Sequence, residues 1–323
     1  MSTPSITPTV PGNFSSCLSR RQFLALTSIA PATVLATSLT SPVFGATSPS
    51  AAPAANIPKA AKRIPIGLEL YSVRNELVRN LPDTLRAVAK MGYEAVEFYS
   101  PYATWTFPFA KGVRTLIDDL GLRCYSTHNG AQSIMPGESM AKAIELNQIL
   151  GARHIIIASP PRDTTGVEGW KRACELFSQA VEQLKPHGLA TGYHNHQTEW
   201  KTLEGGGHIM NVIATNTPPE FVLQLDVGTA LEAGVDPVAW IKSNPGRIKS
   251  VHLKDWTPGS KAEEKAYRVL FGEGVAPWRE IIAAAESVGG VEYYLLEQEG
   301  SRFPEIETAQ RCLDLWKALR KKV

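Results

Sequence analysis

The segment that decides the fold runs from residue 153 to residue 195. It contains a short apolar run, "RHIIIAS" (153–159), a longer segment, "WKRACELFSQAVEQLKPHG" (170–188), and a second short run, "LATGYHN" (189–195). Short apolar runs of this length are typical of buried strands, whereas the longer segment repeats apolar residues at the period of a helix. The pattern predicts strand, helix, strand, and a connection of this length joins parallel strands.

The same alternation recurs along most of the chain. The strand-like runs are residues 64–72, 94–99, 123–128, 153–159, 189–195, 221–227, 248–255 and 292–299. Helix-like segments separate them, and the least regular, "GGHIMNVIATN" (206–216), is assigned from its position as much as from its pattern. The order predicts an α/β fold, a (β/α)8 TIM barrel, as a single domain over residues 64–323. A doubly wound open sheet is the alternative, but the chain shows no glycine-rich phosphate loop.

The first 46 residues differ from the rest of the chain in their charge and composition. Between Met1 and Ala46 the only charged residues are Arg20 and Arg21, in "SRRQFLAL", and a modest apolar run follows them. An arginine pair before such a run predicts a twin-arginine export signal over residues 1–46, and residues 47–63 read as a flexible linker. The alternative is a disordered N-terminus with a chance arginine pair. We expect a periplasmic or otherwise exported protein with no stable membrane span after processing, since Pro31 interrupts the apolar run.

Net charge and cysteine spacing argue against a nucleic-acid-binding protein and against a disulfide-stabilised one. Without Arg20 and Arg21 the formal net charge of +2 falls to zero, so we expect no nucleic-acid partner. Cys124, Cys174 and Cys312 lie far apart in the sequence. They predict buried small side chains rather than a disulfide scaffold.

Polar residues stand at nearly every predicted strand end, where TIM barrels collect their functional groups. They are Glu69, Glu97, His128, His194, His196, Asp226, His252, Lys254 and Glu297. Any one of them reads equally well as an exposed loop residue. Burying several charges costs several kcal/mol unless they are paired or bind a metal, so the set as a whole indicates a site.

The last four strands contribute His194, Asp226, His252 and Glu297. Two imidazoles and two carboxylates suit one divalent ion, Mn²⁺, Zn²⁺, Fe²⁺ or Co²⁺, better than they suit Ca²⁺. As alternatives, Asp226 caps the turn that follows it, and Glu297 pairs with Lys254.

Six pieces occur in order: "GLELYSVR", "GYEAVEF", "GYHNHQTEW", "LQLDVG", "VHLKDW" and "LLEQE". Together they resemble the sugar phosphate isomerase/epimerase family of xylose isomerase-like barrels, over nearly all of residues 64–319. The resemblance implies a TIM barrel with one divalent ion, for which we favour Mn²⁺, held by His194, Asp226, His252 and Glu297. It also implies isomerisation or epimerisation of a sugar or keto sugar by proton transfer next to a carbonyl.

The chain departs from the best-understood epimerases of that family at one ligand. They carry a glutamate, which helps to move the proton, where this chain has His194. A ligated imidazole has used its lone pair and is a weak base. Proton transfer is therefore expected from Glu297 or His128, with His196 either moving a proton or supporting a ligand. Lys254 either stabilises an enolate oxygen or only pairs with Glu297.

Residues around the predicted mouth are candidates for binding the sugar. They are Glu69, Glu97, Tyr71, Trp105 and Trp256, although the aromatic ones read equally well as packing. Export, together with the lack of an anion-binding loop, favours a substrate without phosphate.

The expected reaction begins with deprotonation next to a carbonyl, the ion stabilising the enediolate as a Lewis acid. Loss of a neighbouring group instead of reprotonation would make the enzyme a lyase or hydratase of 3-keto glycosides or keto sugars. A non-catalytic sugar-binding barrel and an endonuclease IV-like nuclease are rival interpretations. The nuclease would need more metal ligands and a basic DNA-binding face. Homo-oligomerisation stays open.

Overall fold

The computed structural model describes residues 63–321, except 163, 205 and 259–265. The predicted export signal (1–46) and nearly all of the predicted linker (47–63) lie outside the described residues, so both stay predictions. Among the described residues, no helix has both the length and the apolar character needed to cross a membrane.

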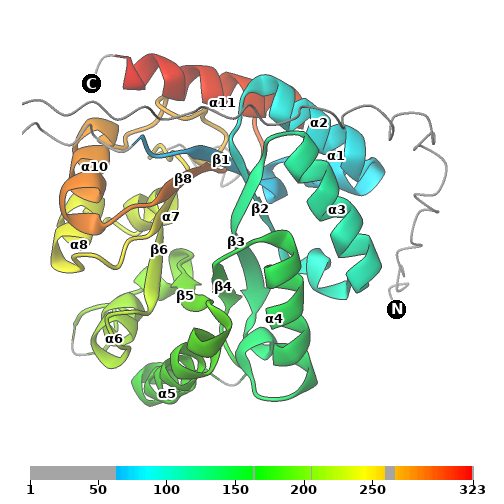
Figure 1. The fold of residues 1–323 in the computed structure, drawn as a ribbon. Coiled ribbons are helices and arrows are strands. Elements are labelled where there is room, and N and C mark those ends of the chain that lie inside the picture. The colour runs from blue at the N-terminus through cyan, green and yellow to red at the C-terminus, as the bar shows by residue number, and fades with distance from the viewer. Residues whose placement is uncertain (1–62, 163, 205, 259–265, 322–323) are drawn as a thin grey trace, which may run out of the picture. The chain divides into compact units, whose positions relative to one another are not determined.

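Parallel strands form a closed barrel in the order in which they occur in the chain (Figure 1). The strands are β1 (Ile66–Glu69), β2 (Ala95–Phe98), β3 (Arg123–Gly130), β4 (His154–Ser159), β5 (Ala190–His194), β6 (Val222–Asp226), β7 (Ser250–Leu253) and β8 (Tyr293–Leu296). Each predicted strand-like run contains or overlaps one of them. The predicted (β/α)8 TIM barrel is confirmed, and the alternative of an open sheet is wrong because β1 pairs with β8.

Helices surround the strands (Figure 1). They are α1 (Arg74–Arg79), α2 (Leu81–Met91), α3 (Phe107–Asp119), α4 (Glu138–Leu150), α5 (Gly166–Leu184), α6 (Ile209–Asn216), α7 (Val227–Glu232), α8 (Pro237–Ser243), α10 (Trp278–Ala284) and α11 (Glu305–Arg320). The weakly predicted helix after the fifth strand is present as α6. The last helix, α11, packs beside α2, where the Tyr93 hydroxyl donates to the Ala309 carbonyl at 2.8 Å.

Strands β1 and β6 end sooner than predicted, because the carboxylate at the last residue of each starts a helical turn. The Glu69 side chain accepts a hydrogen bond from the Tyr71 backbone amide and starts a 3₁₀ turn over Leu70–Val73. Asp226 accepts from the Thr229 amide at 2.9 Å and starts α7, a helix that the sequence did not predict. Candidate site residues thus lie at the points where the chain leaves the barrel.

The strand period of two places polar side chains inside the barrel beneath the candidate residues. Gln224 precedes Asp226 by two positions and Ser250 precedes His252 by two, so each pair faces the same side. Gln224 Nε2 donates to Ser250 Oγ at 2.9 Å, which shows that these side chains meet in the interior. The other faces of these strands carry apolar residues that pack against the helices, for example Leu223, Leu225 and Val251, each at most 1% exposed.

The cysteines behave as predicted. Cys124, Cys174 and Cys312 are free and buried.

At Gly192, in β5, any side chain is predicted to destabilise the barrel. A Cβ atom there would lie 2.4 Å from the Val222 carbonyl oxygen, a clash with backbone on the neighbouring strand. Gly192→Ala should therefore lower the free energy of unfolding by about 1–3 kcal/mol, as overpacking does. Chemical denaturation would measure this.

Gly112→Ala is the control. Gly112 lies within α3, where an added Cβ meets nothing within 4 Å, so this variant should be neutral or more stable. Equal stability of the two variants would contradict the packing of β5 against β6.

Candidate metal centre

Four side chains from the last four strands converge at one end of the barrel. His194, Asp226, His252 and Glu297 each offer a nitrogen or oxygen atom, and these atoms lie within 4.8 Å of one another. All four side chains are buried. The structure thus brings together the four residues that the sequence predicts as metal ligands.

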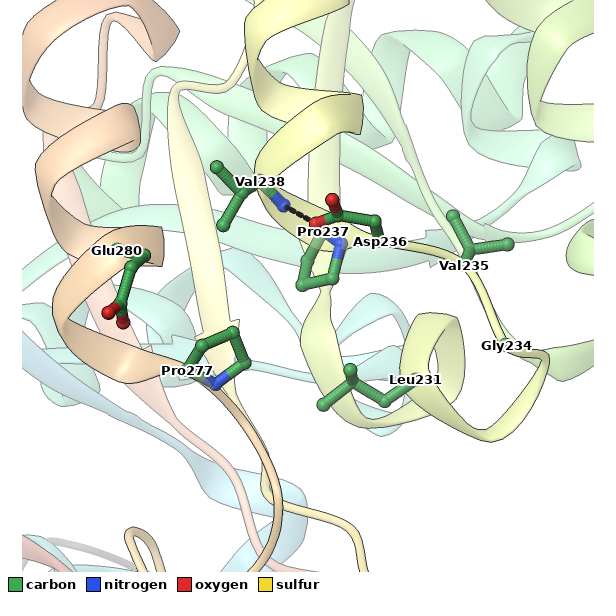
Figure 2. Close-up of a pocket in the computed structure, with 8 residues that line it drawn as sticks. All are labelled: Leu231, Gly234, Val235, Asp236, Pro237, Val238, Pro277 and Glu280. Atoms are coloured by element: carbon green, nitrogen blue, oxygen red, sulfur yellow. Dashed lines mark hydrogen bonds between the residues drawn. The ribbon is translucent and has the colours of Figure 1, made fainter.

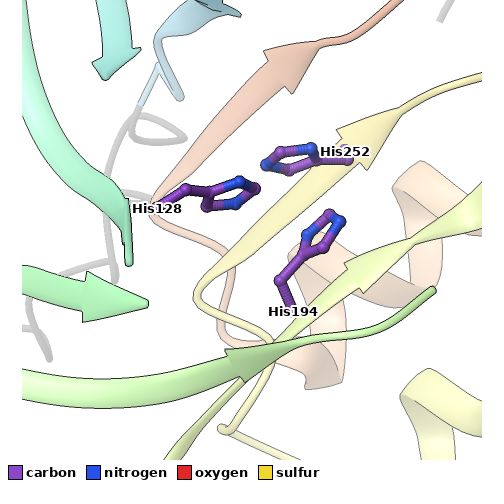
Figure 3. A group of neighbouring side chains, drawn as sticks. All are labelled: His128, His194 and His252. Carbon is purple, nitrogen blue, oxygen red and sulfur yellow. The ribbon is translucent and has the colours of Figure 1, made fainter. Parts of the chain in front are cut away.

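A third imidazole lies against this group. The rings of His128, His194 and His252 converge from β3, β5 and β7 (Figure 3). The His128 and His252 rings stack with centroids 5.0 Å apart, and the His128 and His194 centroids are 4.5 Å apart. His128 therefore lies at the site itself rather than in an exposed loop.

The two carboxylate oxygens of Asp226 have different surroundings. Oδ1 accepts the Thr229 amide and caps α7. Oδ2 is buried and accepts no hydrogen bond within the described part of the chain, although the Lys254 ammonium lies 3.2 Å away. A buried oxygen without a donor costs free energy, and a bound cation would relieve that cost. The cap and the ligand interpretations are therefore compatible.

His194 faces the same oxygen, with its Nε2 atom 4.0 Å from Asp226 Oδ2. Burial, followed by the neighbouring His128 and His252, holds the pKa of His194 well below its usual value. The ring is therefore neutral near pH 7, as a metal ligand must be.

His252 lies between two carboxylates. Its Nδ1 atom is 2.6 Å from Glu297 Oε2, and its Nε2 atom is 2.8 Å from Glu97 Oε2. Burial alone would lower the pKa of His252, but Glu97 and Glu297 raise it to about 10. Burial likewise opposes ionisation of Glu97, but His128 and His252 lower its pKa to about 2. His252 is therefore an imidazolium between two ionised carboxylates, Glu97 and Glu297.

Lys254 is a buried ammonium among three carboxylates. It lies 3.2 Å from Asp226 Oδ2 and 3.9 Å from Glu297 Oε1, and it donates a hydrogen bond to Glu299. Burial opposes its charge, but these carboxylates raise its pKa well above the usual value. Lys254 is therefore a fixed positive charge, and its contact with Glu297 is the longest of the three.

Two further predicted residues, Glu69 and His128, meet across the barrel mouth. His128 Nε2 is 2.7 Å from Gln224 Oε1 and 3.1 Å from Glu97 Oε2, while its Nδ1 atom is 3.6 Å from Glu69 Oε1. Burial, then Glu97 and Glu297, raise the pKa of Glu69 well above its usual value.

Glu97 was predicted to bind the sugar, but the structure surrounds it with other buried side chains. This carboxylate is fully buried, accepts from Ser126 and Gln224, and contacts His252. Those contacts make it a support for the imidazoles, and a direct contact with a sugar stays a prediction.

His196 and Tyr71 lie nearer the surface. The His196 ring meets the His194 ring edge-on with centroids 4.9 Å apart, and the His196 amide donates to Glu199 at 2.8 Å. Tyr71 is 39% exposed beside Glu69, with the Arg74 guanidinium 4.4 Å from its ring. Both residues are at the rim of the site, and their predicted roles stay predictions.

The two predicted tryptophans have different surroundings. Trp105 packs edge-on against Phe98 and Phe109, with centroids 5.2 and 5.1 Å away, which favours the packing alternative. Trp256 follows β7 and Asp255, and its buried Nε1 atom has no hydrogen-bond partner among the described residues.

Two residues at the site were missed by the sequence analysis. Gln224 contacts both His128 and His194, and the Tyr267 ring lies 4.9 Å from the Lys254 ammonium. The sequence could have identified Gln224, because it is a polar residue inside an apolar strand and on the same face as Asp226. Tyr267 comes from the long segment after β7, and no sequence pattern there indicates a site residue.

A pocket of about 550 Å³ lies elsewhere, at α7, α8 and α10 (Figure 2). Its lining residues are Leu231, Gly234, Val235, Asp236, Pro237, Val238, Pro277 and Glu280. Asp236 uses a carboxylate oxygen to cap α8 at the Val238 amide, 2.8 Å away. The chemistry-bearing groups converge at the barrel mouth instead, and we place the candidate site there.

Comparison with known proteins agrees with this fold. The sequence profile described as xylose isomerase-like TIM barrel matches residues 85–319. The chain belongs to this family. A sugar phosphate isomerase/epimerase from Parabacteroides distasonis has a similar crystal structure, with 26% identity, a TM-score of 0.66 and coverage of 80% of this chain and 96% of that one.

Two further proteins are similar, one over part of the sequence and one in fold alone. The inosose dehydratase of Mesomycoplasma hyopneumoniae is 38% identical over 93 residues, so the match spans 28% of this chain and only 30% of that protein. The IOLI protein, whose crystal structure has a bound zinc atom, shares the fold at 13% identity with a TM-score of 0.58, covering 77% of this chain and 96% of that one.

Affinity for a divalent ion is predicted to rise with pH. His252 has a pKa of about 10 and is protonated at pH 7, whereas a metal ligand must be deprotonated. Binding of Co²⁺ should therefore release about one proton and strengthen by about tenfold per pH unit below pH 10. Isothermal titration calorimetry in buffers of different ionisation enthalpy would count the proton.

His187→Gln should keep the same pH dependence, because His187 is exposed in the turn that precedes β5, whereas His194 ends that strand. Binding of Co²⁺ that is independent of pH and releases no proton would contradict the assignment of His252 as a ligand.

Proposed function

We propose that this protein is a divalent-metal-dependent isomerase or epimerase of a sugar or keto sugar. The observation that carries the proposal is the convergence of His194, Asp226, His252 and Glu297. The Oδ2 atom of Asp226 accepts no hydrogen bond among the described residues and lies 3.2 Å from the Lys254 ammonium. Membership of the xylose isomerase-like family and the likeness to a sugar phosphate isomerase/epimerase support it.

The donor set fits one divalent ion. Mixed nitrogen and oxygen donors suit Mn²⁺, Zn²⁺, Co²⁺ or Fe²⁺. The zinc atom bound in the IOLI structure, which has the same fold, supports this choice of ions. When bound, the ion supplies Lewis acidity to a carbonyl and an adjacent hydroxyl.

His128 is the best-placed base for the proton next to the carbonyl. It touches the two imidazoles of the group without belonging to the four ligands, and its Nδ1 atom makes no contact shorter than 3.6 Å with a carboxylate. Glu297 is less suited, because Lys254 and His252 overcome the effect of burial and lower its pKa. A strongly stabilised carboxylate is a weak base.

Two neighbours would assist His128. The fixed positive charge of Lys254 would stabilise negative charge on a substrate oxygen, since its raised pKa prevents it from acting as a base. Glu69 would hold a proton more readily than an ordinary carboxyl group and could return it, because its pKa is raised and its Oε1 atom faces His128.

A sugar would approach from the side of His128 and Glu297, each 8% exposed, past Tyr71 at the rim. An exported protein meets free or oxidised sugars more often than sugar phosphates, so we propose a substrate without phosphate in the periplasm or outside the cell.

A lyase or dehydratase is the second candidate. The specific observation in its favour is the partial match to an inosose dehydratase, a protein named for removing water from a keto-inositol. The first step would be the same proton abstraction by His128. The C–O bond on the next carbon would then break, and the oxygen would take up the proton from His128 and leave as water or as the aglycone alcohol.

Deuterium exchange would separate these reactions. The Mn²⁺-loaded protein would be incubated in D₂O with a panel of ketoses, keto-glycosides and inososes and followed by NMR. Deuterium next to the carbonyl without loss of a group indicates an isomerase or epimerase, and release of water or an aglycone indicates a lyase. No exchange and no product in the whole panel would contradict the proposal that this is an enzyme of this class.

Two substitutions should affect different steps. His128→Gln should lower kcat by about 10²–10⁴-fold, as loss of a general base does, with little change in ion affinity. Asp226→Asn should weaken ion binding itself, because the amide replaces a carboxylate ligand. His187→Gln is the control and should match the wild type. Full activity of His128→Gln would show that another group removes the proton.

A further inference from the structure

Gln224 lies at the centre of the network beneath the candidate ligands. It is fully buried in β6, two residues before Asp226. Its Nε2 atom donates to Glu97 Oε1 at 3.1 Å and to Ser250 Oγ at 2.9 Å. Because an ionised carboxylate only accepts hydrogen bonds, Glu97 fixes which end of the amide faces it. The amide oxygen must then point the other way.

That oxygen lies between two imidazoles. Gln224 Oε1 is 2.9 Å from His194 Nδ1 and 2.7 Å from His128 Nε2. A carbonyl oxygen has two lone pairs and no hydrogen to donate, so both ring nitrogens must carry the hydrogen. One amide therefore sets the tautomers of two histidines.

The consequence for His194 is a free lone pair on the opposite nitrogen. A neutral imidazole with its hydrogen on Nδ1 has an unprotonated Nε2, and this atom faces Asp226 Oδ2 at 4.0 Å. Two acceptors face one another with no hydrogen between them, which is the arrangement that a cation stabilises.

We propose that Gln224 is a positioning residue that locks His194 as the Nδ1–H tautomer and so offers Nε2 to the divalent ion. The same bond holds His128 with its Nδ1 atom turned toward Glu69 and the barrel mouth. This inference rests on the proposed function, because the ion is the one assigned above to His194, Asp226, His252 and Glu297. Glu97 completes the arrangement by orienting both the amide and the His252 ring.

Gln224→Met tests the inference, because methionine has a similar length and no strong donor or acceptor. Loss of a hydrogen bond that orients a metal ligand typically costs 10–100-fold in metal affinity, and we expect a fall of about that size for Co²⁺. In the metal-free variant, ¹⁵N NMR of the histidine rings should show that His194 no longer holds its hydrogen on Nδ1 alone.

Asn147→Leu is the matched control. Asn147 is an equally buried amide, bonded to Thr127, Tyr102 and the Ala143 carbonyl, away from the three imidazoles. It should lower thermal stability while leaving Co²⁺ affinity and the His194 tautomer unchanged.

The outcomes separate the inference from the proposed function. If the wild type shows the Nδ1–H tautomer at His194 but binds no Co²⁺, the proposed function fails and the role of Gln224 in fixing the tautomer stands. If the wild type binds Co²⁺ and Gln224→Met binds it equally well, the inference is overturned. An Nε2–H tautomer at His194 in the wild-type protein would also overturn it, even if the variant does not fold.

Discussion

The structure depends on the neutralisation of carboxylates that are buried inside the barrel. Glu97, Asp226 and Glu297 are at most 8% exposed, and ionised carboxylates in such places cost several kcal/mol unless cations face them. Lys254 and His252 are the cations, and contact with these carboxylates raises the pKa of both. The ion that we propose would replace the proton on His252, so that the site gains one net positive charge among its buried carboxylates.

The barrel creates this cluster through the geometry of parallel strands. Residues two positions apart face the same side, so Gln224 stands beneath Asp226 and Ser250 stands beneath His252. The result is an outer layer of donors supported by an inner layer of hydrogen bonds, with Glu97 joining both. The outer residues of these strands would thus bind the ion and substrate, and the inner residues orient them through hydrogen bonds.

Much of this arrangement is predictable from the sequence. The remainder depends on contacts between distant residues and on single side-chain caps, which a sequence pattern does not reveal. Alternating apolar patterns predict the barrel, and the rule that function collects at strand ends brings His194, Asp226, His252 and Glu297 together. Helix α7 was missed because its start depends on one side-chain cap. The role of Glu97 depends on His252, which is 155 positions away in the sequence, and pattern alone carries no such information.

The central claim is that the four converging donors form a divalent-ion site. Anomalous X-ray diffraction at the cobalt edge, from crystals of the protein grown with Co²⁺, tests it most directly. One strong peak is expected among His194, Asp226, His252 and Glu297. A peak at another place in the molecule, with none beside the Asp226 Oδ2 atom, would contradict it.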